Sequence, residues 1–527
     1  MDGGLLTIAT VEKTFEAPVR GDLAQAPPDR LVLVFLATCS LYLLSSSGYI
    51  ALSDADSMLA VTHSLLAHHD FYVNPSLGVP GVGGHHYSIY GFGWSAAVLP
   101  PYLLGMVLQD RVSVTDHGGL PVFFASFLNP VLMAVAAALV YAFVVHLTQS
   151  LRRGLIVAAV FALTTPAWPF TKDGFSEPLV LTCLVSATYL LRHGVSLSPF
   201  RAASAGALLG LAILTRLDAT PEVLVALIYG LAPPERRRQW PAALLVGSVF
   251  TAMALYLAYD QIRFGSPLRT GYEYYGYGTR FQRSLLNTGV ALGEEVLNPT
   301  RGLLWFVPVS LVSAAAFPTF FRRHRSEGLL ALSMFLFAWI EHADIFISWQ
   351  GGWTWGPRFL IPVLPFLCLP LCAIGDSLPW RLGLGLCSLL GFAVNLPAVL
   401  VSYTRYFYAV AADPSTTPWP SLFLARSAVQ VGRLVLARRV PNGRITELAS
   451  QGPAAVVSGA TSLNAPDFWW FFLIHEQSHV AAVTALAAGL FLAFCILTPL
   501  AWRRSSAAAA GARSPASTAA RSSGTGA

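Results

Sequence analysis

The sequence predicts an all-α polytopic membrane protein. Of its 527 residues, 55% are hydrophobic and only 11% are charged, whereas charged residues make up about 25% of an average soluble protein. Apolar stretches of nearly 20 residues recur along the chain, and a helix of that length crosses the hydrocarbon core of a bilayer. These two observations predict a bundle of membrane-spanning helices.

One apolar segment is set apart from the expected spans by its composition. The segment 92–109 is interrupted by glycines and by Pro100-Pro101, so we expect a helix that lies on the outer leaflet or dips into it. If this segment crosses instead, one terminus changes side, which gives a range of about 12 to 13 spans. The expected spans are 31–51, 121–147, 154–170, 176–191, 200–215, 219–232, 241–260, 302–321, 328–347, 359–375, 382–403 and 481–502.

Short runs of arginine predict which loops face the cytosol, because cytosolic loops carry an excess of Lys and Arg. With the N-terminus inside, the outer face receives three long segments, 53–120, 261–301 and 404–480, and the working surface faces outward. The inner runs are Arg152-Arg153, Arg236-Arg237-Arg238, Arg322-Arg323-His324-Arg325 and Arg503-Arg504.

The two ends of the chain differ from the transmembrane domain, which we place at 31–502. Residues 1–30 mix both charge signs and have no apolar core before Leu31, so we expect a cytosolic segment and an uncleaved first span. Residues 503–527 consist mainly of Ala, Ser, Gly and Arg. Such a composition buries too little apolar surface to fold, which predicts a disordered cytosolic tail.

The composition also excludes some classes of function. The net charge of +6 comes from arginines in short loops between spans, which serves orientation in a bilayer rather than binding of nucleic acid. All the cysteines fall inside apolar spans, so neither a disulfide framework nor a Cys-ligated metal is expected. They are Cys39, Cys183, Cys368, Cys372, Cys387 and Cys495.

Two acids directly after the first span are the most informative feature for function. Ser53 and Asp56 have the spacing of a capping box, and apolar residues follow at helical intervals, which predicts an amphipathic helix at the membrane surface. A charged carboxylate close to lipid is costly and usually has a use. Asp54 lies in the first turn, where the helix dipole favours the ionised form. We therefore expect Asp54 to be a catalytic base, with helix capping as the alternative role of both Asp54 and Asp56.

Histidines crowd the same outer segment, at positions 63, 68, 69, 85 and 86. Histidines beside aspartates are able to bind a metal. Their spacing fits no standard signature, so we expect no metal and no other cofactor, and a divalent ion remains an alternative.

Four cations lie at the outer ends of expected spans, against the tendency of positive charge to stay inside. A lipid-linked phosphate suits them as a partner, because Arg binds phosphate in a bidentate manner. Contact with lipid headgroups is the alternative, and for Arg216 so is a salt bridge to Asp218. Glu177 either stabilises the start of the next helix or belongs to the same site. The four cations are Lys172, Arg216, Arg301 and Arg358.

A set of short motifs, taken in this order, resembles the bacterial GT-C glycosyltransferases, nearest to the protein O-mannosyltransferase-like family 39 architecture. The resemblance covers roughly 31–500 and implies a GT-C-like bundle with juxtamembrane helices in the first outer loop. Two departures stand out: Ala55 separates two acids that related chains have side by side, and Ile89 stands where a Lys is common. The motifs are Ser53-Asp54, Tyr87-Ser88-Ile89-Tyr90-Gly91-Phe92-Gly93, Phe175-Ser176-Glu177-Pro178, Arg263-Phe264-Gly265-Ser266-Pro267, Arg301-Gly302-Leu303, Gly352-Trp353 with Gly356-Pro357-Arg358, and Asp467-Phe468-Trp469-Trp470.

The resemblance implies an inverting transferase of the bacterial inner membrane, with its active site on the periplasmic face. It would move a hexosyl or pentosyl unit from a polyprenyl-phosphate carrier to a glycan, lipid or protein of the cell envelope. An acid of the first outer loop, Asp54 or Asp56, would be the base, and Tyr87, Tyr90 and Trp353 would join Glu177 and the cations in binding substrate. A transporter or lipid flippase, or a sugar-polymer ligase of related fold, remains an alternative.

Overall fold

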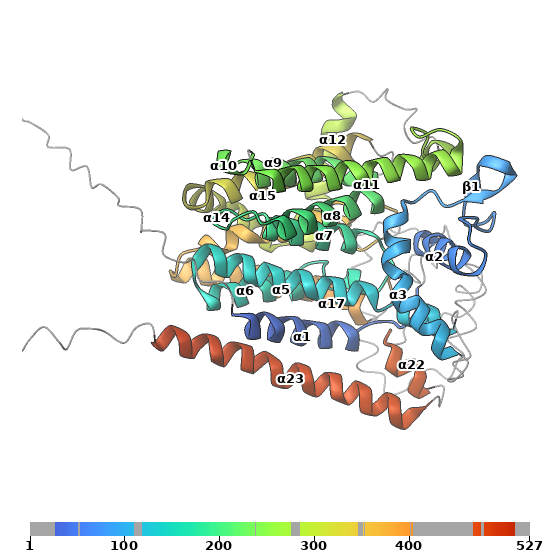
Figure 1. The fold of residues 1–527 in the computed structure, drawn as a ribbon. Coiled ribbons are helices and arrows are strands. Elements are labelled where there is room, and N and C mark those ends of the chain that lie inside the picture. Colours follow the sequence, from blue (N-terminus) through green and yellow to red (C-terminus); the bar gives the residue numbers. More distant parts are fainter. Residues whose placement is uncertain are drawn as a thin grey trace, which may run out of the picture.

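The chain is an all-α polytopic membrane protein, and the prediction of its fold class is confirmed (Figure 1). The computed structural model describes residues 27–50, 53–109, 119–237, 239–275, 285–345, 351–352, 354–400, 402–403, 467–475 and 479–511. Within these residues the only strands are β1 (Val79–Pro80) and β2 (His86–Tyr87), which form one antiparallel hairpin. Residues 404–466, the residues beyond 511 and Trp353 lie outside the described residues.

Helix occurs in each of the twelve expected spans, although 359–375 contains only short helical turns. Four stretches of the described residues are long and apolar enough to cross a membrane, Gly119–Thr148, Trp240–Phe264, Leu378–Leu400 and Val480–Trp502. The helices at the spans are α1 (Pro28–Leu44), α4 (Gly119–Ala125), α5 (Leu128–Thr148), α6 (Leu151–Thr164), α7 (Glu177–Leu190), α8 (Pro199–Thr215), α9 (Thr220–Leu231), α11 (Trp240–Phe264), α13 (Leu303–Phe306), α14 (Val309–Arg323), α15 (Arg325–Ile345), α16 (Leu364–Cys368), α17 (Leu378–Leu400) and α23 (Val480–Gly511).

The span expected at 359–375 is a chain of short turns instead of one helix. Pro362, Pro365 and Pro370 interrupt it, and each proline removes a backbone donor that a continuous α-helix needs. The segment therefore runs as η5 (Arg358–Val363), α16 and η6 (Leu369–Ala373). The remaining elements are α2 (Ser53–Ala67), η1 (Val82–Gly84), α3 (Phe92–Gln109), η2 (Pro169–Thr171), η3 (Leu217–Ala219), α10 (Pro234–Arg237), η4 (Gly271–Tyr275), α12 (Leu285–Leu297) and α22 (Trp469–His475).

Helix α5 forms the centre of the bundle, between α1, α6 and α7. It is apolar on all sides, and Met133, Ala137 and Phe143 are fully buried, as expected for a helix with no solvent-facing stripe. Helices α17 and α23 instead leave large apolar side chains exposed, among them Leu389 and Phe491. An extensive exposed apolar surface of this kind marks the boundary with lipid.

Helices α2 and α3 and the hairpin lie together at one end of the bundle, and α10 lies at the other end (Figure 1). Helix α3 crosses this end beside α2. Its start approaches the end of α8 so closely that a Cβ at Gly93 would lie 2.2 Å from the Thr215 hydroxyl. The arginines of α10 and the acid at position 54 are therefore at opposite ends.

A buried ion pair joins three parts of the chain at the end that carries α2. Lys172 lies 2.9 Å from the Asp467 carboxylate and also donates to the Val399 carbonyl at 2.6 Å. Tyr49 donates to the other carboxylate oxygen at 2.5 Å, and both members of the pair are at most 5% exposed. Lys172 was predicted to bind a phosphate, but its contacts give it a structural role between α1, the 171–176 loop and α22.

Replacing Lys172 with Met leaves the Asp467 carboxylate buried without its cation. Removing one partner of a buried pair costs about 3–5 kcal/mol, more than removing both. We expect Lys172→Met to lower the thermal unfolding midpoint in detergent strongly, and the double variant Lys172→Met/Asp467→Leu to recover part of the loss. Equal midpoints for the single and double variants would show that the pair adds no coupling.

Candidate functional site

Asp54 lies in the first turn of α2, where it meets the side chain of Arg358. Arg358 donates through Nη2 to the Asp54 carboxylate at 2.8 Å, and the Tyr90 hydroxyl also hydrogen-bonds this carboxylate. The Asp54 side chain is 22% exposed, so a ligand from outside is able to reach it. The start of α2 adds the positive end of the helix dipole.

Arg358 is held in place on all sides. Its Nε donates to Glu177 at 2.5 Å, its Nη1 donates to the Gly351 carbonyl at 3.2 Å, and its guanidinium lies 4.3 Å from the centre of the Phe175 ring. The side chain is 10% exposed. Arg358 therefore offers Asp54 a fixed positive charge.

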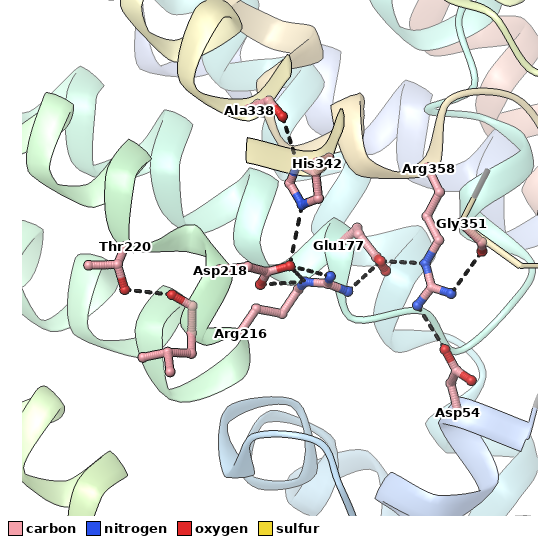
Figure 2. A network of polar contacts seen from close by, with 10 residues as sticks. Asp54, Glu177, Arg216, Asp218, Thr220, Ala338, His342, Gly351 and Arg358 are labelled. Atoms are coloured by element: carbon pink, nitrogen blue, oxygen red, sulfur yellow. Dashed lines mark hydrogen bonds and ion pairs between the residues drawn. The ribbon is translucent and has the colours of Figure 1, made fainter. Parts of the chain in front are cut away.

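Glu177 connects this pair to a second arginine. One carboxylate oxygen of Glu177 accepts from Arg358 and also from Arg216, each at 2.5 Å. Arg216 then binds Asp218, at 2.5 Å through Nη2 and at 3.0 Å through Nε. We call Asp54, Arg358, Glu177, Arg216, Asp218 and His342 the ionic chain (Figure 2).

His342 of α15 ends the ionic chain. Its Nε2 lies 3.4 Å from Asp218 and its Nδ1 lies 2.7 Å from the Ala338 carbonyl oxygen. Both neighbours are acceptors, so the ring pairs with both only when each nitrogen carries a proton. In that form, three carboxylates face two guanidinium groups and one imidazolium, and the charges balance.

The loop 171–176 positions Glu177 at the start of α7. Asn129 of α5 donates to the carbonyls of Asp173 and Phe175, at 2.5 and 3.0 Å. Gly174 allows the start of α2 to approach, because a Cβ there would lie 2.5 Å from the Cβ of Ala55. Ala55 is fully buried, so an acid at this position would lack solvent.

A turn of two glycines brings Arg301 next to Arg358. Gly351 and Gly352 adopt φ of 70° and 74°, which only glycine adopts without strain. The Gly352 carbonyl accepts from Arg301, while the Gly351 carbonyl accepts from Arg358. Arg301 is therefore on the same side of the site as Arg358.

The two acids of α2 titrate differently. Burial acts to raise the pKa of Asp54, but the Arg358 charge and the hydrogen bonds from Tyr90 and Arg358 outweigh it, and the pKa lies below its ordinary value. Asp56 keeps much of its surface exposed. Partial desolvation by the surrounding protein, together with the Asp54 charge, raises its pKa to about 6. No hydrogen bond or ion pair of the Asp56 side chain occurs within the described residues.

Five of the predicted site residues come together: Asp54, Tyr90, Glu177, Arg216 and Arg358. Arg301 joins them through the glycine turn, and Asp56 lies two positions from Asp54, on a different face of α2.

Tyr87 belongs to the hairpin, where it is buried and donates to the Val82 carbonyl at 3.3 Å. Its contacts place it away from the ionic chain. Trp353 lies outside the described residues, so its predicted role stays a prediction.

Sequence reasoning missed His342 as a part of the site. Glu341-His342 interrupts an apolar span. An ionisable residue within a span usually marks a functional site, so this dipeptide is the signal that could have identified His342. Tyr272 packs edge-on against Tyr90, with ring centres 6.2 Å apart, and belongs to a tyrosine-rich outer segment.

The histidines of the first outer segment do not gather around one point. His63 Nδ1 lies 3.2 Å from the Tyr102 hydroxyl oxygen, and His85 stacks on Tyr72 with ring centres 3.8 Å apart. Over the residues that the structure describes, no three His, Cys, Asp or Glu side chains are grouped so as to hold a metal ion.

Comparison with known proteins gives few matches. No family model and no curated protein matches the chain. Among solved structures, ArnT from Cupriavidus metallidurans in the apo state is 14% identical, with a TM-score of 0.48 over 89% of this chain and 75% of that one. ArnT from Cupriavidus metallidurans bound to undecaprenyl phosphate is 15% identical, with a TM-score of 0.45 over 86% and 78%.

We expect Asp56→Asn to stabilise the protein at pH 8. The folded-state pKa of Asp56 is about 6, above the unfolded value of about 3.9, so ionisation of Asp56 disfavours the folded state as the pH rises from 4 through 6. The gain in thermal unfolding midpoint should be small, because the side chain is exposed, and should vanish below about pH 4.

Asp70→Asn is the control, because it should change the stability at pH 8 in the opposite direction. Burial acts against ionisation of Asp70, but hydrogen bonds from Ser64 and from the Tyr72 amide together outweigh it and hold its pKa below the ordinary value. Its loss should therefore lower the midpoint at pH 8. A pH-independent effect of Asp56→Asn would show that the charge of Asp56 does not matter.

Proposed function

We propose that this protein is an inverting glycosyltransferase that moves a sugar from a polyprenyl-phosphate carrier to an acceptor hydroxyl at the outer face of the bacterial inner membrane. The observation that carries the proposal is the fixed contact between Asp54 and Arg358, at the end of the bundle where α2 and α3 lie. An ionised carboxylate and a cation that is suited to phosphate meet there.

Asp54 takes the proton of the acceptor hydroxyl in this proposal. The acceptor oxygen attacks the anomeric carbon as the bond from that carbon to the phosphate oxygen breaks, and the configuration inverts. The carrier leaves as a polyprenyl monophosphate, which is stable as an anion, so no general acid is needed. The low pKa of Asp54 keeps it ionised at neutral pH.

Arg358 and Arg301 are the cations that we assign to the leaving phosphate. Both reach the glycine turn 351–352, and positive charge fixed where negative charge develops stabilises the transition state. Within the described residues, the guanidinium group of Arg216 instead donates its hydrogen bonds to Glu177 and Asp218. We therefore assign Arg216 to orienting Glu177, and through it Arg358.

Replacing Asp54 with Asn tests the base directly. We expect transfer of sugar from a lipid-linked donor by the purified enzyme to fall by about 100-fold or more, since a general base contributes factors of this size. Asp56→Asn is the matched control on the same helix and should keep most of the activity. Near-wild-type turnover of Asp54→Asn would remove the assignment, and the opposite ranking would make Asp56 the base.

Replacing Arg358 with Gln should change the pH profile as well as the rate. Loss of the Arg358 charge leaves burial as the main influence, so the pKa of Asp54 rises. A base works only when ionised, so the acid limb of kcat/KM should move to higher pH in this variant. An unchanged acid limb with a lower rate would mean that Arg358 acts on the phosphate alone.

A further inference from the structure

A small pocket lies on the side of the ionic chain away from Asp54. It is enclosed by α7, α9, α15 and the turns η3 and η5. Part of its wall is formed by the ionic chain from Glu177 to His342, together with Glu222. The rest of the wall is apolar and includes Val180 and Pro362. Its lining includes Glu177, Arg216, Asp218, Glu222, His342 and Phe359.

The pocket has more hydrogen-bond acceptors than donors. Arg216 already binds Glu177 and Asp218, and His342 faces Asp218. Glu222 adds a carboxyl group that is only 2% exposed. The Oε2 atoms of Glu177 and Glu222 are buried and accept no hydrogen bond within the described part of the chain.

Buried carboxylate oxygens of this kind require a donor. The carboxylates of Glu177 and Asp218 line the pocket and disfavour an anion as the occupant. A metal ion is not favoured either, because the described His, Cys, Asp and Glu side chains form no group of three that could hold one. The remaining class of occupant is a group that donates hydrogen bonds.

We propose that this pocket is a subsite that receives one hydroxyl or ammonium group of the transferred sugar and rejects a carboxylate in its place. The inference rests on the proposed function and deepens it, because it assigns the sugar and the phosphate to different residues. Glu177 belongs to both parts: its Oε1 orients Arg358, and its Oε2 remains available to the pocket. One carboxylate thereby links recognition of the sugar to the position of the phosphate cation.

Binding of short-chain carriers to the purified full chain tests the subsite. The probes are citronellyl phosphate without sugar and citronellyl phosphate linked to glucose, glucosamine or glucuronic acid. The wild type should bind the glucose and glucosamine carriers at least about tenfold more tightly than the glucuronic acid carrier, about 1.4 kcal/mol. Equal affinity for the glucuronic acid carrier would overturn the proposal without use of any variant.

Glu222→Gln separates the sugar contact from the phosphate contact. It should weaken the glucose or glucosamine carrier about five- to tenfold and leave the affinity for bare citronellyl phosphate unchanged. Glu235→Gln, which changes an exposed acid of α10, is the matched control and should change neither. A loss confined to the glucosamine carrier identifies an ammonium site, whereas equal losses identify a hydroxyl site.

Two other results would refute the subsite. If Glu222→Gln changes the unfolding midpoint but no affinity, the pocket holds an ordered water only. If it weakens all carriers alike, the pocket serves the fold or the phosphate. Failure of the proposed function looks different, because the wild type would then transfer no sugar from any carrier while its binding preference could still be measured.

Discussion

The arrangement of the site depends on the Glu177 carboxylate and its contacts with two arginines. Its single oxygen Oε1 accepts from two arginines that lie 39 and 181 residues further along the chain. Two guanidinium groups this close and this buried repel each other unless an anion lies between them, and buried charges are tolerated only when paired. The carboxylate therefore fixes the start of α7, the end of α8 and the start of η5 relative to one another. The start of α2 is added when Asp54 pairs with Arg358.

Hydropathy was sufficient to predict the helices, because the bilayer requires long apolar stretches with all backbone groups paired internally. The same rule could not predict how 359–375 runs. Its apolar length is that of a span, yet its prolines divide it into η5, α16 and η6. The glycines of 92–109 have a separate effect, since they allow the close approach of α3 to α8 at Thr215.

Charge placement predicted much of the ionic chain but not its pairing. Glu177, Arg216 and Arg358 were singled out because each is a charged residue at the end of a span. Lys172 satisfied the same rule, but it turns to Asp467, which is 295 residues away. Sequence spacing carries no information about pairing over such distances. The packing of Ala55 against Gly174 is likewise a contact between distant parts of the chain that no sequence motif predicts.

The pairing of Asp54 with Arg358 poses a chemical question, because a carboxylate stabilised by a guanidinium is a weaker base. A weak base is acceptable when the bond to the leaving group breaks early, since glycosyl transfer passes through an oxocarbenium-like transition state in which the acceptor proton becomes acidic late. The proposed phosphate also changes the pairing. When a phosphate binds at Arg358, the positive charge is shared between the phosphate and Asp54, so the carboxylate regains basicity as the donor arrives. Arg358 would thus keep Asp54 ionised in the empty site, and phosphate binding at Arg358 would make Asp54 a stronger base in the occupied site. Glu177 would hold the guanidinium between Asp54 and the phosphate.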